Sequence, residues 1–446
     1  MRQENKNNCH NRAVIIAWYF PPVGGPGVQR TLKYCKYLPL CGWHLAVFSG
    51  VDSDEHQDPG LVDEIPNNVM VHRLSRPNST WRILRNWLFS QQLGPIGLGR
   101  LGHWGGFIKD FPDTMREWAD AVVDLAVTEH RRHPFDVVYT TSYPYSVHLA
   151  GLRLKQKLGI PWVADLRDPW AENELMLGQL PGWMRARHAR AERRMIEACD
   201  AVVSAHPGHA DRLRERYGLS AQRCVAITNG YDPEDYRDFP PPPAIAADGV
   251  VRLVHTGSFY GDYSPAPLVR ALEQAWRPLP PGMKMLELRL IGGDGGVSFP
   301  DRPGLRVVVR PRVSHGDALQ EQAEANLLLC VFDRRTGATN VSGKLFEYLA
   351  SGRPILGILP REGTMAEIIR TTRTGWVADC DSPDEVMDAL HAAIFDRTLA
   401  ISAYSPDQEA VARFARPALA CHLTEVLEGV MKTAPSAGEA KAVRLA

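Results

Sequence analysis

The chain has 446 residues, a length typical of two or three domains, and its 51 lysines and arginines equal its 51 aspartates and glutamates. The resulting net charge of zero excludes a protein whose whole surface is adapted to nucleic acid or an acidic polymer. The apolar runs are far shorter than the roughly 18 residues that span a bilayer, and the polar start does not resemble a secretory signal. The eight scattered cysteines, without a CxxC pair, predict reduced thiols in the cytosol and no structural zinc.

Short apolar runs rich in β-branched residues, each followed by a helical pattern, predict parallel strands that crossover helices bury on both faces. The first half of the chain contains six such runs, at residues 13–18, 45–48, 137–140, 162–164, 201–204 and 224–227. The second half contains five, at residues 251–255, 286–291, 306–309, 327–332 and 354–358. The pattern predicts an α/β protein with two Rossmann-like parallel-sheet domains.

Proline-rich sequence separates the two halves, because proline lacks the N–H that a helix or central strand requires. The predicted organisation is a first domain over 1–235 with an insertion at 78–109, a linker at 236–247, a second domain over 248–400, a C-terminal helical segment at 401–432 that crosses back to the first domain, and a mobile tail at 433–446.

A glycine-rich turn follows the first predicted strand. Gly24 and Gly25 come directly before a stretch whose apolar residues recur at helical spacing from Val28. Such a turn exposes backbone N–H groups at the positive end of a helix dipole, which suits an anion or a sugar. The alternative interpretation, a tight strand-to-helix turn without a ligand, has equal weight on spacing alone.

The insertion at 78–109 contains tryptophans, phenylalanines, arginines and a lysine but no aspartate or glutamate. Aromatic and cationic residues without acids suit the headgroup layer of an anionic membrane. The alternative is a loop that packs on the first domain through its tryptophans.

Two further strand ends in the first half carry polar groups. Tyr143 follows a strand rich in hydroxyls, a composition suited to sugars, and His148 comes one turn later, where a hydrogen-bonded core residue is the commoner outcome. Asp165, Arg167 and Asp168 follow another strand, at the edge where α/β proteins bind ligands. The alternative for these three charges is an internal Arg–Asp pair.

The second half of the chain has glycines at two strand ends and a predicted helix with charged residues in its first two turns. Gly257 with Ser258, and Gly292, end two of its strands. Ser342 is placed to cap a helix that Gly352 ends, so Gly343, Lys344 and Leu345 lie in its first turn and Glu347 lies one turn further on. This arrangement suits a phosphate and a ribose diol, whereas an ordinary capped helix with a solvated lysine and glutamate is the alternative.

Taken in order, these motifs resemble the retaining branch of the nucleotide-sugar-dependent glycosyltransferases with the GT-B fold, which includes bacterial polysaccharide and lipid-sugar transferases. The likeness depends on the Gly24–Gly25 loop, the Asn-Gly-Tyr-Asp segment at 229–232, the strand ends at 255–259 and 291–294, and Lys344 with Glu347 before the segment at 350–354. It implies two Rossmann-like domains that face a central cleft, a first glycine loop near the donor diphosphate and sugar, a glutamate at 347 that binds the ribose, and no metal requirement.

Three positions depart from the family pattern. Thr339 stands where the family usually has a second glutamate that contacts the donor sugar, and no basic residue follows Gly257 closely, which leaves Lys344 as the diphosphate cation. The Asp165, Arg167 and Asp168 cluster replaces the histidine that often serves as a base.

The predicted site residues fall into three groups. The catalytic group is Asp165, Arg167 and Asp168. Donor binding is predicted at Gly24, Gly25, Gly257, Ser258, Gly292, Ser342, Gly343, Lys344, Leu345 and Glu347. Contact with the acceptor or the sugar is predicted at Tyr143, His148 and Thr339, and no metal ligands are predicted.

The predicted function is transfer of a sugar from a nucleotide-sugar to a hydroxyl acceptor, with retention of configuration, in polysaccharide or glycolipid biosynthesis. The acceptor is expected to be lipid-linked and the protein cytoplasmic and peripheral on the membrane, with no nucleic-acid partner and no cofactor. A nucleotide-sugar epimerase and a non-catalytic sugar-nucleotide-binding subunit remain as alternatives.

Overall fold

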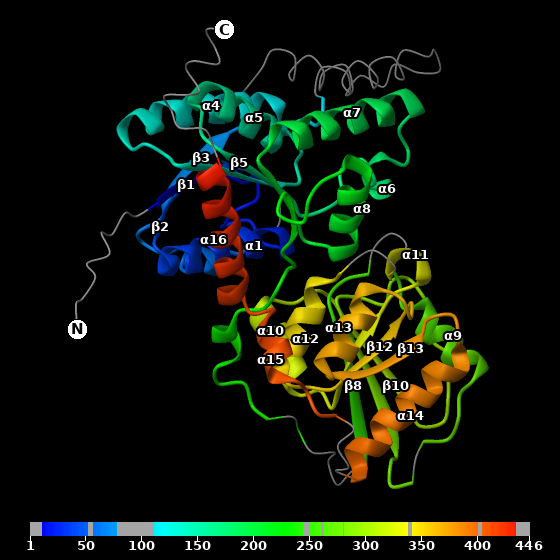
Figure 1. Cartoon of the computed structure of the whole chain (residues 1–446). Helices are drawn as coiled ribbons and strands as arrows, with labels where there is room; N and C mark the ends of the chain where they lie inside the picture. Colours follow the sequence, from blue (N-terminus) through cyan, green and yellow to red (C-terminus); the bar gives the residue numbers. More distant parts are fainter. Residues whose placement is uncertain are drawn as a thin grey trace, which may run out of the picture. The chain divides into compact units, whose positions relative to one another are not determined.

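A computed structural model (Figure 1) describes residues 11–51, 57–77, 111–241, 243, 249–259, 263–279, 281–337, 341–399 and 404–433. The predicted insertion at 78–109, the tail beyond 433 and Thr339 lie outside these ranges. Two compact units emerge: Met1–Thr228 with Ala420–Ala446, and Asn229–Leu419. Among the described residues, no helix combines the length and the apolar character needed to cross a membrane.

The first unit is built on a seven-stranded parallel sheet in the order β3-β2-β1-β4-β5-β6-β7. Its strands are β1 (Asn11–Ile16), β2 (Trp43–Val51), β3 (Met70–Ser75), β4 (Val137–Ser142), β5 (Trp162–Leu166), β6 (Ala201–Ser204) and β7 (Cys224–Ala226). The four residues from Ala13 to Ile16 in β1 and all of β4, β5 and β6 are buried, as expected for strands that helices cover on both faces.

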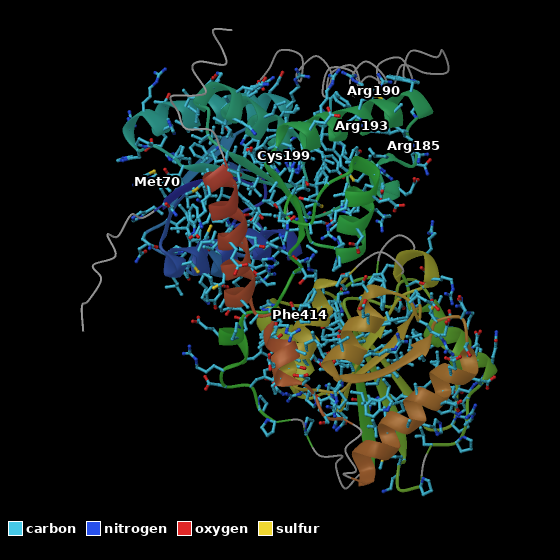
Figure 2. All side chains as sticks on the ribbon, viewed as in Figure 1. Met70, Arg185, Arg190, Arg193, Cys199 and Phe414 are labelled. Carbon is cyan, nitrogen blue, oxygen red and sulfur yellow. The ribbon has the colours of Figure 1, made fainter. Side chains whose placement is uncertain are left out.

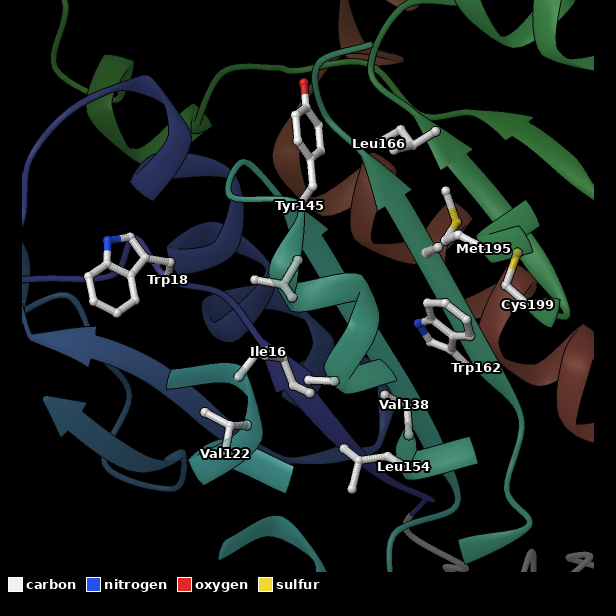
Figure 3. Close-up of a cluster of buried hydrophobic side chains, with 14 of the residues drawn as sticks. Ile16, Trp18, Val122, Val138, Tyr145, Leu154, Trp162, Leu166, Met195 and Cys199 are labelled. Atoms are coloured by element: carbon white, nitrogen blue, oxygen red, sulfur yellow. The ribbon is translucent and has the colours of Figure 1, made fainter. Parts of the chain in front are cut away.

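Helices connect these strands on both faces of the sheet. They are α1 (Pro26–Tyr37), the 3₁₀ turns η1 (Leu38–Cys41) and η2 (Pro59–Val62), α4 (Arg116–Arg132), α5 (Ser146–Leu158), α6 (Glu174–Leu177), α7 (Gly182–Ala198) and α8 (Pro207–Tyr217). One continuous core joins α4, α5, α7 and α8 to the sheet, and Cys199, just after α7, is part of it (Figures 2 and 3). Val122, Leu154 and Met195 contribute to this core from three of these helices, and Trp162 contributes from β5.

The second unit contains a six-stranded parallel sheet in the order β10-β9-β8-β11-β12-β13. Its strands are β8 (Val250–Thr256), β9 (Met285–Ile291), β10 (Leu305–Arg310), β11 (Leu327–Val331), β12 (Ile355–Leu359) and β13 (Gly375–Asp379). The two sheets confirm the predicted α/β class with a parallel sheet in each half of the chain.

Two cores cover the faces of this second sheet. Its helical elements are η3 (Pro233–Tyr236), α9 (Ala266–Gln274), α10 (His315–Ala323), α11 (Arg334–Gly337), α12 (Gly343–Ser351), α13 (Thr364–Thr372), α14 (Pro383–Leu399) and α15 (Gln408–Ala412). One core contains side chains of α9 and α14, and the other contains side chains of α12 and α13. Leu345, Phe346 and Tyr348 anchor α12 and so fix the direction of its remaining face.

The predicted C-terminal helical segment at 401–432 contains two helices, α15 and α16 (Arg416–Thr433). The interruption follows from backbone pairing with the start of the second unit. The Tyr231 N–H donates to the Phe414 carbonyl at 3.1 Å, and the Arg416 N–H donates to the Tyr231 carbonyl at 2.8 Å. These groups are therefore unavailable to a continuous helix, and α16 carries the chain from the second unit into the first.

Candidate functional site

Two glycine-bearing strand ends meet backbone to backbone in the second unit. Gly257 follows β8 and Gly292 follows β9, and each has a φ of +117°. A Cβ on Gly292 would lie 2.6 Å from the carbonyl carbon of Gly257, so no side chain fits between the two segments. The Gly257 N–H donates to the Ile291 carbonyl at 2.6 Å. The two predicted positions therefore come together and need glycine for both conformation and space.

Lys344 lies over this bare backbone. It belongs to the first turn of α12, and a Cβ on Gly257 would overlap its Cε and Nζ atoms. Its ammonium group donates to the Tyr263 hydroxyl at 3.2 Å and lies 4.8 Å from the centre of that ring. The lysine predicted as the phosphate-binding cation is thus held at the end of β8 by an aromatic residue that sequence reasoning did not identify.

A directional chain of hydrogen bonds fixes Tyr263. The Nδ1 atom of His255 lies 3.0 Å from the Leu329 carbonyl, which can only accept, so Nδ1 carries the proton. The Nε2 atom then accepts from the Tyr263 hydroxyl at 3.2 Å, which leaves the tyrosine oxygen to accept from Lys344. Burial lowers the pKa of His255 to about 3, so the imidazole stays neutral and the chain keeps this direction.

Burial also lowers the pKa of Lys344, to about 8, although Cys330 and Glu347 oppose the shift. The ammonium form still prevails at neutral pH, but it lacks part of its hydration. Such a cation is expected to gain more from a bound anion than an exposed lysine would.

Glu347 lies one turn after Lys344 on α12. Its carboxylate accepts from the Gln322 side chain at 3.3 Å, and Gln322 also donates to the Thr256 hydroxyl at 3.3 Å. Burial raises the pKa of Glu347, while His315, Gln322 and Lys344 oppose that shift. The carboxylate is therefore positioned from β8 and α10 but not saturated by hydrogen bonds.

Tyr236 places a hydroxyl near Glu347. This oxygen is buried and has no hydrogen-bond partner within the described part of the chain. Burial raises the pKa of Tyr236, and the charge of Glu347 adds to the shift. An unsatisfied hydroxyl beside a carboxylate is a suitable arrangement for a polar ligand group.

An open, acidic pocket of about 250 Å³ lies close to this region, between η3 and α10. Glu234, Asp235 and Asp238 contribute to its lining, together with Leu319 and Gln320. Its negative charge suits a neutral or cationic group rather than a phosphate.

The remaining predicted donor residues of α12 have different roles. Ser342 is the N-cap residue by position, but its side chain makes no capping hydrogen bond. A Cβ added to Gly343 would meet open space, so its backbone is accessible. The Leu345 side chain is completely buried in the core, and its backbone N–H donates to the Ser342 carbonyl at 3.2 Å, so neither group is open to a ligand. Ser258 is half-buried.

In the first unit, the glycine-rich loop and the charged end of β5 come together. Gly25 has a φ of +118° and precedes α1, and its carbonyl accepts from the Val28 N–H at 3.1 Å. The Arg167 guanidinium lies against Gly27, where a Cβ would overlap its Nη1 atom. Gly24 is half-buried beside this loop. The structure thus adds a cation to the predicted glycine loop.

Arg167 also pairs with Asp168, from Nη2 at 2.8 Å and from Nε at 3.1 Å. Burial would raise the pKa of Asp168, but Arg167 outweighs it and holds the pKa below the usual range. The Asp168 side chain keeps 42% of its exposure, so this carboxylate is ionised and accessible.

His206 lies near Asp168, two residues beyond the end of β6. The strand register pairs Leu166 with Ser204, so Asp168 and His206 follow neighbouring strands at equal offsets. Burial lowers the pKa of His206, and Asp168 acts in the opposite direction. Sequence reasoning missed this histidine, although its place after an apolar run was a usable signal.

Asp165 points into the protein. It has no exposed surface, and it accepts from Arg30 Nε at 2.8 Å, Tyr139 at 2.6 Å and Thr141 at 2.9 Å. Arg30 is equally buried and also donates to the Thr228 carbonyl at 3.0 Å. Asp165 is therefore part of an internal Arg–Asp pair, with Arg30 as the partner and not Arg167, and a carboxylate so enclosed does not suit the predicted role of a base.

The two predicted acceptor contacts at the end of β4 differ from each other. His148 is 1% exposed, bonds to Thr140 at 2.9 Å through Nδ1, and has a pKa lowered to about 3 by burial. Such a histidine is a neutral core residue and is unsuited to acceptor contact. Tyr143 is half-buried, with its ring 5.5 Å from that of Tyr145, and remains accessible to a ligand.

One group of three potential metal ligands lies within the described residues, at Asp379, Cys380 and Asp381. Arg334 pairs with Asp379 at 2.8 Å and with Asp381 at 2.5 Å, so arginine already compensates these carboxylates.

Comparison with protein families matches residues 24–230 to the glycosyl transferase 4-like domain. The first unit of the chain is therefore similar to members of that family. A comparison with curated proteins gives no significant match.

Solved structures extend the similarity to the whole architecture. Sucrose-phosphate synthase from Thermosynechococcus elongatus matches with a TM-score of 0.64 and 16% identity, over 95% of this chain and all of that one. HepE of Anabaena, solved with UDP and glucose, matches with a TM-score of 0.60 and 15% identity, over 94% and 100%. A glycosyltransferase from Rickettsia africae gives 0.59 and 12%, over 95% and 99%. The predicted GT-B fold is thereby confirmed.

Proposed function

We propose that the protein transfers a sugar from a nucleotide-sugar to a hydroxyl acceptor. The observation that carries this proposal is the start of α12, where Lys344 lies over the bare backbone of Gly257 and Glu347 follows one turn later. A cation and a carboxylate at this spacing suit the diphosphate and the ribose of a single ligand.

In the proposed donor complex, Lys344 and the open N–H groups around Gly343 bind the diphosphate at the positive end of the α12 dipole. The Glu347 carboxylate accepts from the ribose hydroxyls, and Tyr236 supplies a further hydroxyl partner. Because a lysine and a helix start offset the charge of the leaving diphosphate, the proposed reaction needs no metal.

The first unit is proposed to bind the acceptor. Asp168, ionised and accessible, with Arg167 and His206 beside it, is the best-placed polar group for the acceptor hydroxyl. During transfer, the acceptor oxygen bonds to the anomeric carbon while the bond from that carbon to the diphosphate breaks. The hydroxyl proton passes to Asp168 or to the departing phosphate. Retention of configuration is proposed by analogy with the resembling family.

The acceptor is proposed to be a lipid-linked precursor of a polysaccharide or glycolipid. The cation-rich and aromatic composition of residues 78–109 supports a membrane partner. Because HepE was solved with UDP, UDP-glucose and glucose, a UDP-sugar is the first donor to test.

A thermal-shift comparison of UDP-, GDP- and dTDP-sugars, followed by an assay of nucleotide release, tests the function. A ligand that binds the folded protein raises its melting temperature by mass action. A transferase releases nucleotide faster when the acceptor is added. Interconversion of the nucleotide-sugar without an acceptor would indicate an epimerase, and binding without turnover would indicate a non-catalytic subunit.

A further inference from the structure

Helix α7 carries a concentrated positive charge on its outer face. Its inner face consists of Met184, His188, Glu192, Met195 and Ile196, all buried. The rest of the helix contains Arg185, Arg187, Arg190, Arg193 and Arg194, against a single exposed acid, Glu197. Since the whole chain has no net charge, this asymmetry is local.

Neighbouring acids leave two of these five arginines without an ion pair within the described residues. Arg190 and Arg194 are exposed and form no ion pair within the described part of the chain. Arg193 approaches Glu197 only to 3.9 Å, and Arg185 pairs with Glu174 of α6 at 2.6 Å. Figure 2 shows Arg185, Arg190 and Arg193 spaced along α7. The face therefore offers several guanidinium groups to an external anion.

Positive charge continues at the edge of this face. Arg187 stacks over the Phe111 ring at 4.0 Å, and Arg116 donates to the Phe111 carbonyl at 3.3 Å. Burial is the main cause of a lowered pKa at Arg187, and the nearby positive charge of Arg116 lowers this pKa further. Arg116 thus brings a second guanidinium group to the edge of this face.

Exposed apolar side chains accompany the cations. Trp183, at the start of α7, is 50% exposed, and Met176 of α6 is 43% exposed. Few other large hydrophobic side chains among the described residues are as exposed as these two. Tryptophan beside arginine is typical of surfaces that contact lipid headgroups, where the ring enters the interface and guanidinium groups bind phosphates.

We propose that the outer face of α7, with Trp183 and Met176 at its edge, docks on an anionic phospholipid surface. This proposal rests on the proposed function in one respect, because the purpose of docking would be to bring the protein to a lipid-linked acceptor. The positive charge of the α7 arginines and the exposed Trp183 both favour an anionic phospholipid surface as the partner. Nucleic acid has matching charge, but it offers no apolar layer for Trp183 and Met176.

Vesicle flotation of the full chain tests the proposal, with phosphatidylcholine alone and with phosphatidylglycerol added. Each cation near an anionic membrane contributes about a five-fold factor in affinity, so Arg190→Gln/Arg194→Gln should weaken binding roughly 30-fold. A matched double variant, Arg306→Gln/Arg413→Gln, removes two exposed charges from the second unit and should bind like the wild type. Added salt should weaken wild-type binding.

Trp183→Ser distinguishes lipid from other polyanions. It should weaken vesicle binding and leave binding to a DNA duplex unchanged. Undiminished flotation of Arg190→Gln/Arg194→Gln, or equal binding of the wild type to uncharged vesicles, would overturn the proposal. Binding to DNA that matches vesicle binding and is insensitive to Trp183→Ser would overturn it as well.

Titration of UDP, GDP and dTDP without vesicles separates this proposal from the proposed function. All these variants should bind nucleotide as the wild type does, because none changes the second-unit site. Vesicle binding without nucleotide binding would contradict the proposed function alone.

Discussion

Replacing Lys344 by methionine should stabilise the unliganded protein and weaken nucleotide binding, two effects of opposite sign. The difference between a pKa of 10.5 and one of about 8 corresponds to roughly 3 kcal/mol at about 1.4 kcal/mol for each pKa unit. Lys344 keeps some exposure, so the expected gain in unfolding free energy at pH 7 is about 1–3 kcal/mol.

The gain should also depend on pH. Because the native pKa lies below the unfolded value, the native protein binds fewer protons between about pH 8 and pH 10.5. Lys344 should therefore cause the free energy of unfolding of the wild type to rise as pH increases through this interval. The advantage of Lys344→Met should be full below pH 8 and should shrink toward pH 10.

Thermal unfolding at pH 7 and pH 10, with calorimetric titration of UDP, GDP and dTDP, measures both effects. Loss of charge-assisted bonds should reduce the affinity about 10- to 100-fold. Lys33→Met is the matched control, because Lys33 is buried but pairs with Glu64 at 2.5 Å in the first unit, so its loss should destabilise the protein and leave nucleotide binding intact. A Lys344→Met protein that is less stable and binds nucleotide normally would refute the reasoning.

Three further outcomes are expected. Glu347→Gln should weaken nucleotide binding about tenfold or more. The nucleotide affinity of the wild type should also fall as pH is lowered through the raised pKa of Glu347, and calorimetry between pH 5 and pH 8 would measure both effects. Asp165→Asn should cost about 3–5 kcal/mol in urea unfolding, because it leaves a buried arginine without its counter-charge, whereas a protein of normal stability but without activity would indicate a base. Oxidised glutathione should join Cys41 to Cys421, whose sulfurs lie 3.7 Å apart, with release of two molecules of reduced glutathione; intact-mass and peptide analysis that finds both thiols free would contradict this.

Matched variants make these results interpretable. Asp168→Asn, at an accessible carboxylate, should keep the fold within about 1 kcal/mol and lose acceptor-dependent turnover, in contrast to Asp165→Asn. Glu324→Gln changes another acid of the second unit and should leave nucleotide affinity unchanged. Cys421→Ser should abolish the crosslink, while Cys199 should stay unmodified because it is buried.

The strands and the start of α12 were predictable because their signals are local. Burial on both faces produces continuous apolar runs, and Gly352 with Pro354 sets the end of α12, which the structure places at Ser351. The exceptions are β3 and β13, which lie at the sheet edges. Their residues are largely half-exposed and mixed in polarity, so no apolar run identified them.

Contacts between distant residues account for most of what the sequence did not predict. In the second half, Gly257 was expected at a strand end and Lys344 at a helix start. In the first half, Asp165 was expected at a ligand-binding strand end, but its partner Arg30 is 135 residues away in the chain, and nothing near either residue indicates the pair. Tyr263 likewise reaches Lys344 only through the fold.

Calorimetric titration of UDP, GDP and dTDP into the wild type and into Lys344→Met and Glu347→Gln tests the central claim most directly. Saturable binding of one of these nucleotides at a single site, weakened at least about tenfold by each substitution, is the expected result. Failure of all three nucleotides to bind, or equal affinity in both variants, would contradict the assignment of the α12 start as the nucleotide site.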